Sequence, residues 1–267
     1  MTEAVVSLQN KFVKLASSLK QKKYRDELGL FIVEGVRLVE EATQSNWLVE
    51  TCIYTDEAFK QERVRVIITT LQANGCRMIQ VNNVIYDKIT DTKEPQGIMA
   101  VVGKRTYQLR DMQDTKDKSF FMVLDQLQDP GNIGTVIRTA VAAGCTGVVL
   151  TKGCTDVFAT KAVRASMGSI FHIPIIEGVS ASEVISYFSE HAIDILATSL
   201  ESSKIYFDVD YNKSIALVFG NEGNGVSQVL LEHAKERLFI PLLGHVESLN
   251  VAASAAVVLY EVVRQRR

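Results

Sequence analysis

The chain has 267 residues, of which 47% are hydrophobic and 22% are charged, and its formal net charge is −2. This length suits about one or two domains, and the composition is that of an ordinary globular protein, which excludes a disordered chain, a collagen-like fibre and a small disulfide scaffold. The apolar runs are too short for a membrane span, and the first residues lack the apolar core of a secretory signal, so we expect a cytoplasmic protein that binds no membrane.

The first half of the chain predicts alternating helices and strands. Leu8, Phe12, Leu15 and Leu19 recur at helical spacing and predict a helix over 8–23. Strands are expected at 28–35, 48–55, 77–81 and 97–103, and helices at 36–45, 56–75 and 82–91. This alternation is typical of an α/β domain, which we place at 1–104.

A charged stretch without apolar periodicity, residues 105–118, is the predicted linker. A second alternation follows it, whose nearly continuous apolar strands favour a parallel sheet covered on both faces. We therefore predict a second α/β domain over 119–267. Its strands are expected at 120–125, 147–151, 172–176, 193–199, 215–220 and 237–241, and its helices at 133–143, 159–169, 181–190, 226–235 and 249–265.

Charge is distributed unevenly between the halves. Residues 1–110 carry 16 Lys and Arg against 13 Asp and Glu, a net +3, so residues 111–267 carry a net −5. Six cations without an intervening acid lie between residues 11 and 25, which fits a phosphate-binding arm but also one solvated helix face. The candidate RNA-binding residues are Lys11, Lys14, Lys22, Lys23, Arg25 and Arg37.

No metal-ligand pattern is present in the sequence. The four cysteines, Cys52, Cys76, Cys145 and Cys154, are widely spaced without a C-x-x-C pair, and the four histidines are scattered. Isolated cysteines of this kind are typically buried reduced thiols. We therefore predict no metal site.

Three loops that follow predicted strands carry the residues of chemical interest, because ligands bind at the carboxyl ends of strands in open α/β sheets. In the first loop Asn132 can cap a helix, and Arg138 lies further along that mostly apolar helix. A cation in such surroundings needs either a carboxylate partner or a ligand.

The second loop, 217–227, contains a G-x-x-G-x-G spacing, which matches neither a dinucleotide-binding loop nor a Walker loop. Glu222 lies between its glycines and either caps a helix or faces a ligand. The third loop ends at Ser248, a good N-cap for the helix that follows. Residues 251–259 of that helix are apolar all round, which predicts burial inside the domain or against a second subunit.

Together the three loops resemble the SpoU, or TrmH-like, branch of the SPOUT RNA methyltransferases. The matching motifs are Asn132 with Arg138, then 219–223 (FGNEG), then Ile240-Pro241 with 248–251 (SLNV). Their order and approximate spacing also match. A weaker resemblance over 10–103 is to the small L30e-like RNA-binding domain of the family.

The resemblance implies a C-terminal parallel-sheet α/β domain with a deep trefoil knot, a smaller N-terminal L30e-like domain, and a homodimer. It also implies methyl transfer from S-adenosylmethionine to a ribose 2′-hydroxyl of rRNA, or less readily of tRNA. Residues carried over as catalytic are Arg138, Asn132, Glu222, Ser248 and Asn250. Those carried over as cofactor-binding are Thr198, Leu200, Gly220, Asn221, Ile240, Leu242, Ser248 and Leu249.

Two other functions remain open from the residues. A non-catalytic RNA-binding protein with the same fold would not need the intact Arg138 and Glu222. A nicotinamide-dependent oxidoreductase would need G-x-G-x-x-G in the first strand–helix turn, which 124–132 lacks.

Overall fold

The computed structural model describes residues 2–112, 118–202 and 204–267. They form two compact units: unit 1 is Met1–Arg105 with Asp156–Phe171, and unit 2 is Thr106–Thr155 with His172–Arg267. Residues 156–171 lie inside the predicted domain 119–267, but their contacts group them with unit 1.

Unit 1 is built on a five-stranded sheet in the order β1-β4-β3-β5-β2. Strands β1, β4 and β3 are parallel, and β5 runs antiparallel to both β3 and β2. The short, mostly exposed β1 was not predicted, because its four residues show no apolar pattern. The strands are β1 (Thr2–Val5), β2 (Leu30–Glu34), β3 (Val49–Thr55), β4 (Arg77–Val81) and β5 (Ile98–Gly103).

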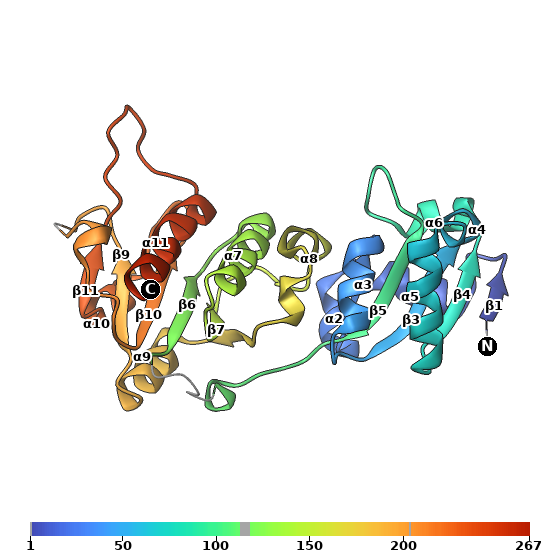
Figure 1. Cartoon of the computed structure of the whole chain (residues 1–267), viewed down its shortest axis with the longest axis horizontal. Helices are drawn as coiled ribbons and strands as arrows, with labels where there is room; N and C mark the ends of the chain where they lie inside the picture. Colours follow the sequence, from blue (N-terminus) through green and yellow to red (C-terminus); the bar gives the residue numbers. More distant parts are fainter. Residues whose placement is uncertain (1, 113–117, 203) are drawn as a thin grey trace. The chain divides into compact units, whose positions relative to one another are not determined.

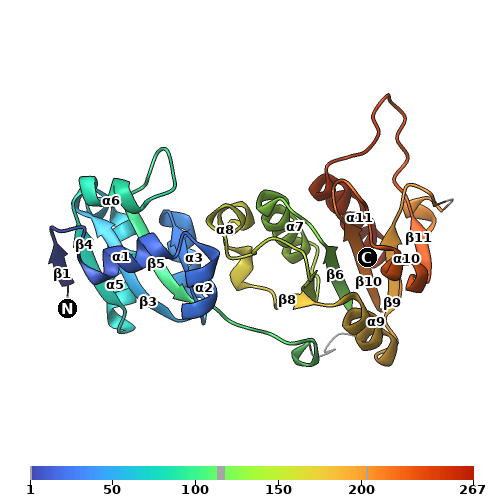
Figure 2. The same cartoon turned by 180° about the vertical axis from the view of Figure 1, so that it is seen from behind.

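Helices cover both faces of this sheet. Helices α1 and α6 pack on one face, as Figure 2 shows, and α3 and α5 on the other. The predicted helix over 8–23 is two helices, α1 and α2, and the predicted helix over 56–75 is also two, α4 and α5. The helices of unit 1 are α1 (Lys11–Ser18), α2 (Lys22–Leu28), α3 (Val36–Gln44), α4 (Asp56–Phe59), α5 (Glu62–Ala73), α6 (Asn83–Ile89) and α8 (Thr160–Ser166).

An aromatic cluster explains why 156–171 belongs to unit 1. The ring centroid of Phe158 lies 4.9 Å from that of Phe31 on β2, and the ring of Phe171 lies 5.3 Å from that of Trp47. All four side chains are buried. Burial of aromatic surface is a large stabilising contribution, so this segment completes the core on that side of the sheet.

Unit 2 is built on a six-stranded, fully parallel sheet in the order β11-β9-β10-β6-β7-β8; Figure 1 labels all of these strands except β8, which Figure 2 labels. This confirms the predicted α/β class. Strand β8 begins later than predicted, after Pro174, which has no N–H to donate to a ladder. The strands are β6 (Phe120–Asp125), β7 (Gly147–Thr151), β8 (Ile175–Val179), β9 (Asp194–Thr198), β10 (Ile215–Gly220) and β11 (Glu236–Leu238).

Two pairs of helices cover the sheet of unit 2. Helices α9 (Ala181–Glu190) and α10 (Gln228–His233) pack on one face, and α7 (Pro130–Ala142) and α11 (Val251–Gln265) lie side by side on the other. Within the single chain, helix α11 buries one face and exposes positions 253, 257, 260 and 264, so its burial on all sides stays a prediction that needs a second subunit. The trefoil knot stays a prediction from the resemblance.

The predicted linker is only partly described, since 113–117 lie outside the described residues. Its first part packs on unit 2: Met112 is buried in the core beneath α9, and its carbonyl accepts a hydrogen bond from the Tyr187 hydroxyl at 2.8 Å. Among the described residues, no helix has the length and apolarity needed to cross a membrane.

Candidate active site

Strand β10 ends in a tight turn that only glycine permits. A Cβ at Gly220 would lie 2.1 Å from the carbonyl carbon of Gly225, so no other residue fits there. Asn221 and Gly225 exchange backbone hydrogen bonds of 2.9 Å, and the Asn221 side chain accepts from the backbone N–H of Gly223. Its amide nitrogen donates to the carbonyl of Gln126, at the end of β6. Asn221 therefore braces the turn and ties it to the neighbouring strand.

Helix α7 is capped by Asp129 and not by Asn132 as predicted. The Asp129 carboxylate accepts from the backbone N–H groups of Gly131 and Asn132, and Pro130 occupies the first turn, where no N–H is needed. The helix begins at Pro130, so Asn132 already lies inside it and the Asp129 carboxylate, three residues earlier, accepts from the free N–H groups. This leaves the Asn132 side chain available for another contact.

Helix α11 is capped by Asn250 and not by Ser248. The Asn250 side-chain oxygen accepts from the backbone N–H of Ala252 at 2.9 Å and of Ala253 at 3.3 Å. The helix begins two residues later than a Ser248 cap would require, and Ser248 lines the adjoining cavity instead.

A chain of side-chain hydrogen bonds joins the three loops. Asn132 Nδ2 donates to Glu222 Oε1 at 3.0 Å, and Asn250 Nδ2 donates to Asn132 Oδ1 at 3.1 Å. The direction of the chain is set at both ends, because the carboxylate only accepts and the N–H groups of α11 only donate. Both amides are therefore held in one orientation.

The Glu222 carboxylate is held in its charged form. Burial raises its pKa, but hydrogen bonds from the Asn132 side chain and from backbone N–H groups, including that of Gln128, outweigh burial and leave the pKa below its ordinary value. Glu222 is therefore a fixed acceptor at neutral pH.

These loops enclose a cavity of about 530 Å³ in unit 2, a size typical of small-molecule sites. All eight predicted cofactor-binding residues line it, as do Glu222 and Asn250. Its walls combine the apolar side chains of Leu200, Leu242 and Leu249 with polar groups near Gly220, which suits a purine with a charged tail. Sequence reasoning missed Ser199, Phe219, Gly223, Gly225, Leu238, Phe239, Glu247, Val251 and Ser254. Most of these residues are neighbours of predicted ones in the sequence. Their position at or just after the end of a predicted strand is the signal that could have identified them.

Arg138 stands apart from this cavity. Its side chain is exposed on α7 and forms no hydrogen bond or ion pair with any residue that the structure describes. It is six positions beyond Asn132, which on an α-helix is about 9 Å along the axis and about 120° around it. The carboxylate partner considered from the sequence is absent among the described residues.

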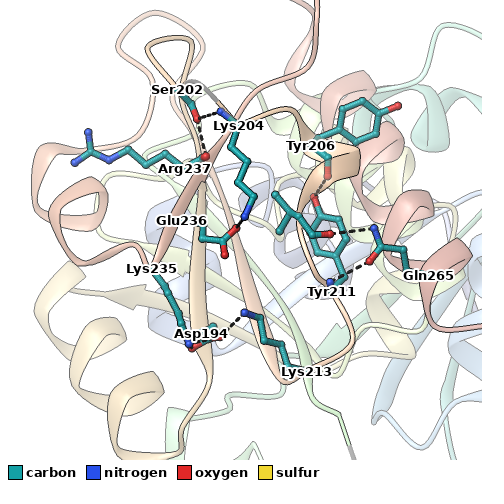
Figure 3. Close-up of polar contacts among 11 residues, drawn as sticks. Asp194, Ser202, Lys204, Tyr206, Tyr211, Lys213, Lys235, Glu236, Arg237 and Gln265 are labelled. Carbon is teal, nitrogen blue, oxygen red and sulfur yellow. Dashed lines mark hydrogen bonds and ion pairs between the residues drawn. The ribbon is translucent and has the colours of Figure 1, made fainter.

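Polar contacts support the outer edge of the sheet beside the cavity (Figure 3). Asp194 pairs with Lys213 and Lys235, both at 2.9 Å, and Lys204 pairs with Glu236 on β11 at 2.5 Å. Near the end of α11, Gln265 donates to the Val209 carbonyl and accepts from the Tyr211 backbone. These contacts hold the segment between β9 and β10, which contributes Leu200 to the cavity.

In unit 1 the candidate RNA-binding residues divide into two groups. Lys11, Lys14, Lys22, Lys23 and Arg37 are exposed. Arg25 is 4% exposed, and its guanidinium donates to Asp156 at 2.7 Å and to two backbone carbonyls at 2.8 Å. The prediction that Arg25 binds RNA is wrong, because these buried partners occupy its donors.

Comparison with known proteins identifies this architecture. The SpoU rRNA Methylase family matches residues 119–260, and the MRM3-like substrate binding domain matches residues 10–100. The chain belongs to the SpoU rRNA methylase family. Its relatives include the 23S rRNA (guanosine(2553)-2′-O)-methyltransferase RlmP of Bacillus subtilis, which is 36% identical over 96% of this chain and 97% of its own length.

Two solved structures extend the likeness of this SpoU methylase to nearly the whole chain. The AdoMet-bound rRNA methyltransferase from Sinorhizobium meliloti is 35% identical, with a TM-score of 0.89 over 98% of both chains. AviRb from Streptomyces viridochromogenes, in complex with the cofactor AdoMet, is 27% identical, with a TM-score of 0.88 over 97% of this chain and 98% of its own. The predicted fold class, enzyme class and cofactor, S-adenosylmethionine, are confirmed.

Proposed function

We propose that this SpoU methylase transfers a methyl group from S-adenosylmethionine to a ribose 2′-hydroxyl of 23S rRNA. The observation that carries the proposal is the joining of three distant loops, through Glu222, Asn132 and Asn250, at the rim of one cavity. The 23S rRNA substrate is that of RlmP, which matches along almost the full length.

When bound, the cofactor supplies a methyl group on a sulfonium, from which a neutral thioether leaves readily. The protein must position a ribose hydroxyl, which is scarcely ionised at neutral pH, and stabilise the negative charge that develops on its oxygen. We assign that stabilisation to Arg138, because a guanidinium stays charged and presents several donors. Asn132, Glu222, Ser248 and Asn250 orient the reacting groups.

The proposal is tested by incubating the purified protein with S-adenosylmethionine and rRNA, and mapping 2′-O-methyl groups by mass spectrometry. A single modified nucleotide in 23S rRNA is expected, with tRNA unmodified. Modified tRNA with unmodified rRNA would overturn the assignment of substrate. RNA binding without methylation would favour the non-catalytic alternative.

The assignment to Arg138 requires a homodimer. Arg138 does not line the cavity of its own chain, so we infer that a second copy brings this cation to the site. Along one face of α11 the exposed positions 253, 257, 260 and 264 include Val257, 38% exposed, and Tyr260, 53% exposed. Ala253, Val257 and Tyr260 form an apolar stripe beside α7 that is a suitable contact surface, and Arg264 at its end is paired with Glu261.

Replacing Val257 and Tyr260 by aspartate is expected to convert dimers to monomers in sedimentation velocity experiments, because buried charges without partners oppose association. Val229→Asp is the control, since Val229 is similarly exposed on α10, outside this face. A wild-type protein that sediments as a monomer at micromolar concentration would contradict the dimer.

Unit 1 is the proposed RNA-docking part. Its exposed lysines at the start of α1 and α2 carry no paired acid among the described residues, whereas Lys20 pairs with Asp91 at 3.0 Å. Free cations of this kind bind phosphate and release counterions. None of the described cysteines, Cys52, Cys76, Cys145 and Cys154, is in a disulfide, which suits a reducing compartment such as the cytoplasm, and cell fractionation would test that location.

Replacing both Lys22 and Lys23 by alanine is expected to flatten the dependence of RNA affinity on salt. Loss of two phosphate contacts should reduce the slope of log affinity against log salt by about 1.5. Filter binding at several salt concentrations measures it. Lys60→Ala with Lys88→Ala, two exposed lysines of the same unit, is the control. An unchanged slope in the Lys22/Lys23 variant would show that α2 does not meet phosphate.

A further inference from the structure

The charged side chains of the cavity are all of one sign. Among the described residues that line it, the only ionisable ones are Glu222 and Glu247, and no lysine, arginine or histidine is present. The cavity therefore attracts positive charge and repels negative charge. A cavity that merely enclosed a neutral purine would not need this bias.

The two carboxylates differ in their hydrogen-bond partners. Glu222 already accepts from Asn132 and from the backbone N–H of Gln128. Glu247 is exposed on the loop before Ser248 and forms no hydrogen bond or ion pair with any residue in the described ranges. The charge of Glu247 is thus uncompensated within the protein and available to a ligand in the cavity.

The cofactor before and after reaction differs in charge at one atom. S-adenosylmethionine has a sulfonium in addition to its amino and carboxylate groups, a net +1, whereas the product S-adenosylhomocysteine has a neutral thioether in its place. During transfer the S–CH₃ bond breaks and its electron pair stays on sulfur. The ribose oxygen bonds to the methyl carbon and loses its proton to water.

We infer that Glu247 makes this cavity discriminate between the charged cofactor and its neutral product, and so favours exchange of one for the other after each turnover. The inference rests on the proposed function, because it assigns the cavity to this cofactor. Glu247 acts through charge, as a specificity-determining residue, and not as a group that takes part in bond making.

The test is calorimetric binding of three probes to the full chain: S-adenosylmethionine, S-adenosylhomocysteine and sinefungin, which has an ammonium group where the cofactor has its sulfonium. Glu247→Gln is expected to weaken the two cationic probes about twofold to fivefold, the effect of one exposed ion pair, and to leave the neutral product unchanged. The difference should shrink in 0.5 M salt, about the range where screening is strong.

Two control variants accompany Glu247→Gln. Glu247→Asp keeps the charge and should retain most of the discrimination, and Glu190→Gln removes an exposed carboxylate of α9 that does not line the cavity. Equal weakening of all three probes in Glu247→Gln, or no weakening of the cationic ones, would overturn the inference. If the unmodified protein binds none of the probes, the proposed function fails together with the assignment of the cavity to this cofactor.

Discussion

The Arg138→Ala variant is expected to lose methyl transfer by about 10²-fold or more while it folds, dimerises and binds S-adenosylmethionine normally. A loss of this size in the rate is typical when an enzyme loses one preorganised hydrogen-bond donor to the negative charge that develops in the transition state. Folding should be unaffected, because the exposed Arg138 has no hydrogen-bond or ion-pair partner among the described residues, so its removal leaves no buried carboxylate behind.

Single-turnover transfer, cofactor affinity and melting temperature are measured on the same preparation. Arg138→Lys is expected to recover little, because an ammonium cannot reproduce the planar fork of a guanidinium. Thr139→Ala, at the next and partly exposed position of α7, is the matched control and should transfer normally. A lower melting temperature with near-normal transfer in Arg138→Ala would assign the residue to the fold and remove it from the mechanism.

Arg25→Ala is expected to destabilise unit 1 by about 3–5 kcal/mol. Both partners of the Arg25–Asp156 pair are buried, with side chains 5% and 6% exposed, so removing the guanidinium leaves Asp156 as an uncompensated buried charge. The two carbonyls that Arg25 satisfies, those of Leu19 and Lys20, also lose their donor.

Trp47, the only tryptophan of the chain, reports this unfolding directly, because it lies in the aromatic cluster with Phe158 and Phe171. Urea denaturation followed by its fluorescence should show an earlier midpoint in Arg25→Ala. Combining Arg25→Met with Asp156→Leu should recover much of the loss, since a buried pair replaced as a whole leaves no lone charge. An unchanged midpoint accompanied by a flatter salt dependence of RNA binding would restore Arg25 to the RNA-binding surface.

The two arginines show how far a local sequence pattern can be used. Arg138 is singled out by a local pattern, a cation on an apolar helix six residues after Asn132; the structure places it exposed on α7, and its role stays a prediction. Arg25 belongs equally well to a local pattern, the run of cations from Lys11. Its actual partner, Asp156, lies 131 positions away in the sequence, and no local pattern predicts a contact over that separation.

The helix caps show the same limit at short range. Ser248 and Asn132 are good caps by residue type, but Asn250 and Asp129 cap α11 and α7. Each helix begins where the sheet and its packing place the first turn, and a shift of two or three residues changes which side chain meets the free N–H groups. Because Asp129 caps α7, the Asn132 side chain can hydrogen-bond to Glu222 and Asn250 instead.

The sequence by itself determined the alternation of strands and helices, the parallel class of the second sheet, and the three loops that hold the site. These follow from periodicity and from glycine and proline residues, which act over a few neighbours. Only the tertiary structure decided that Asp156–Phe171 completes unit 1, that Arg25 is buried, and that Glu222, Asn132 and Asn250 form one chain of hydrogen bonds. Each of these depends on contacts between residues far apart in the chain, whose burial and pairing are settled only when the core has formed.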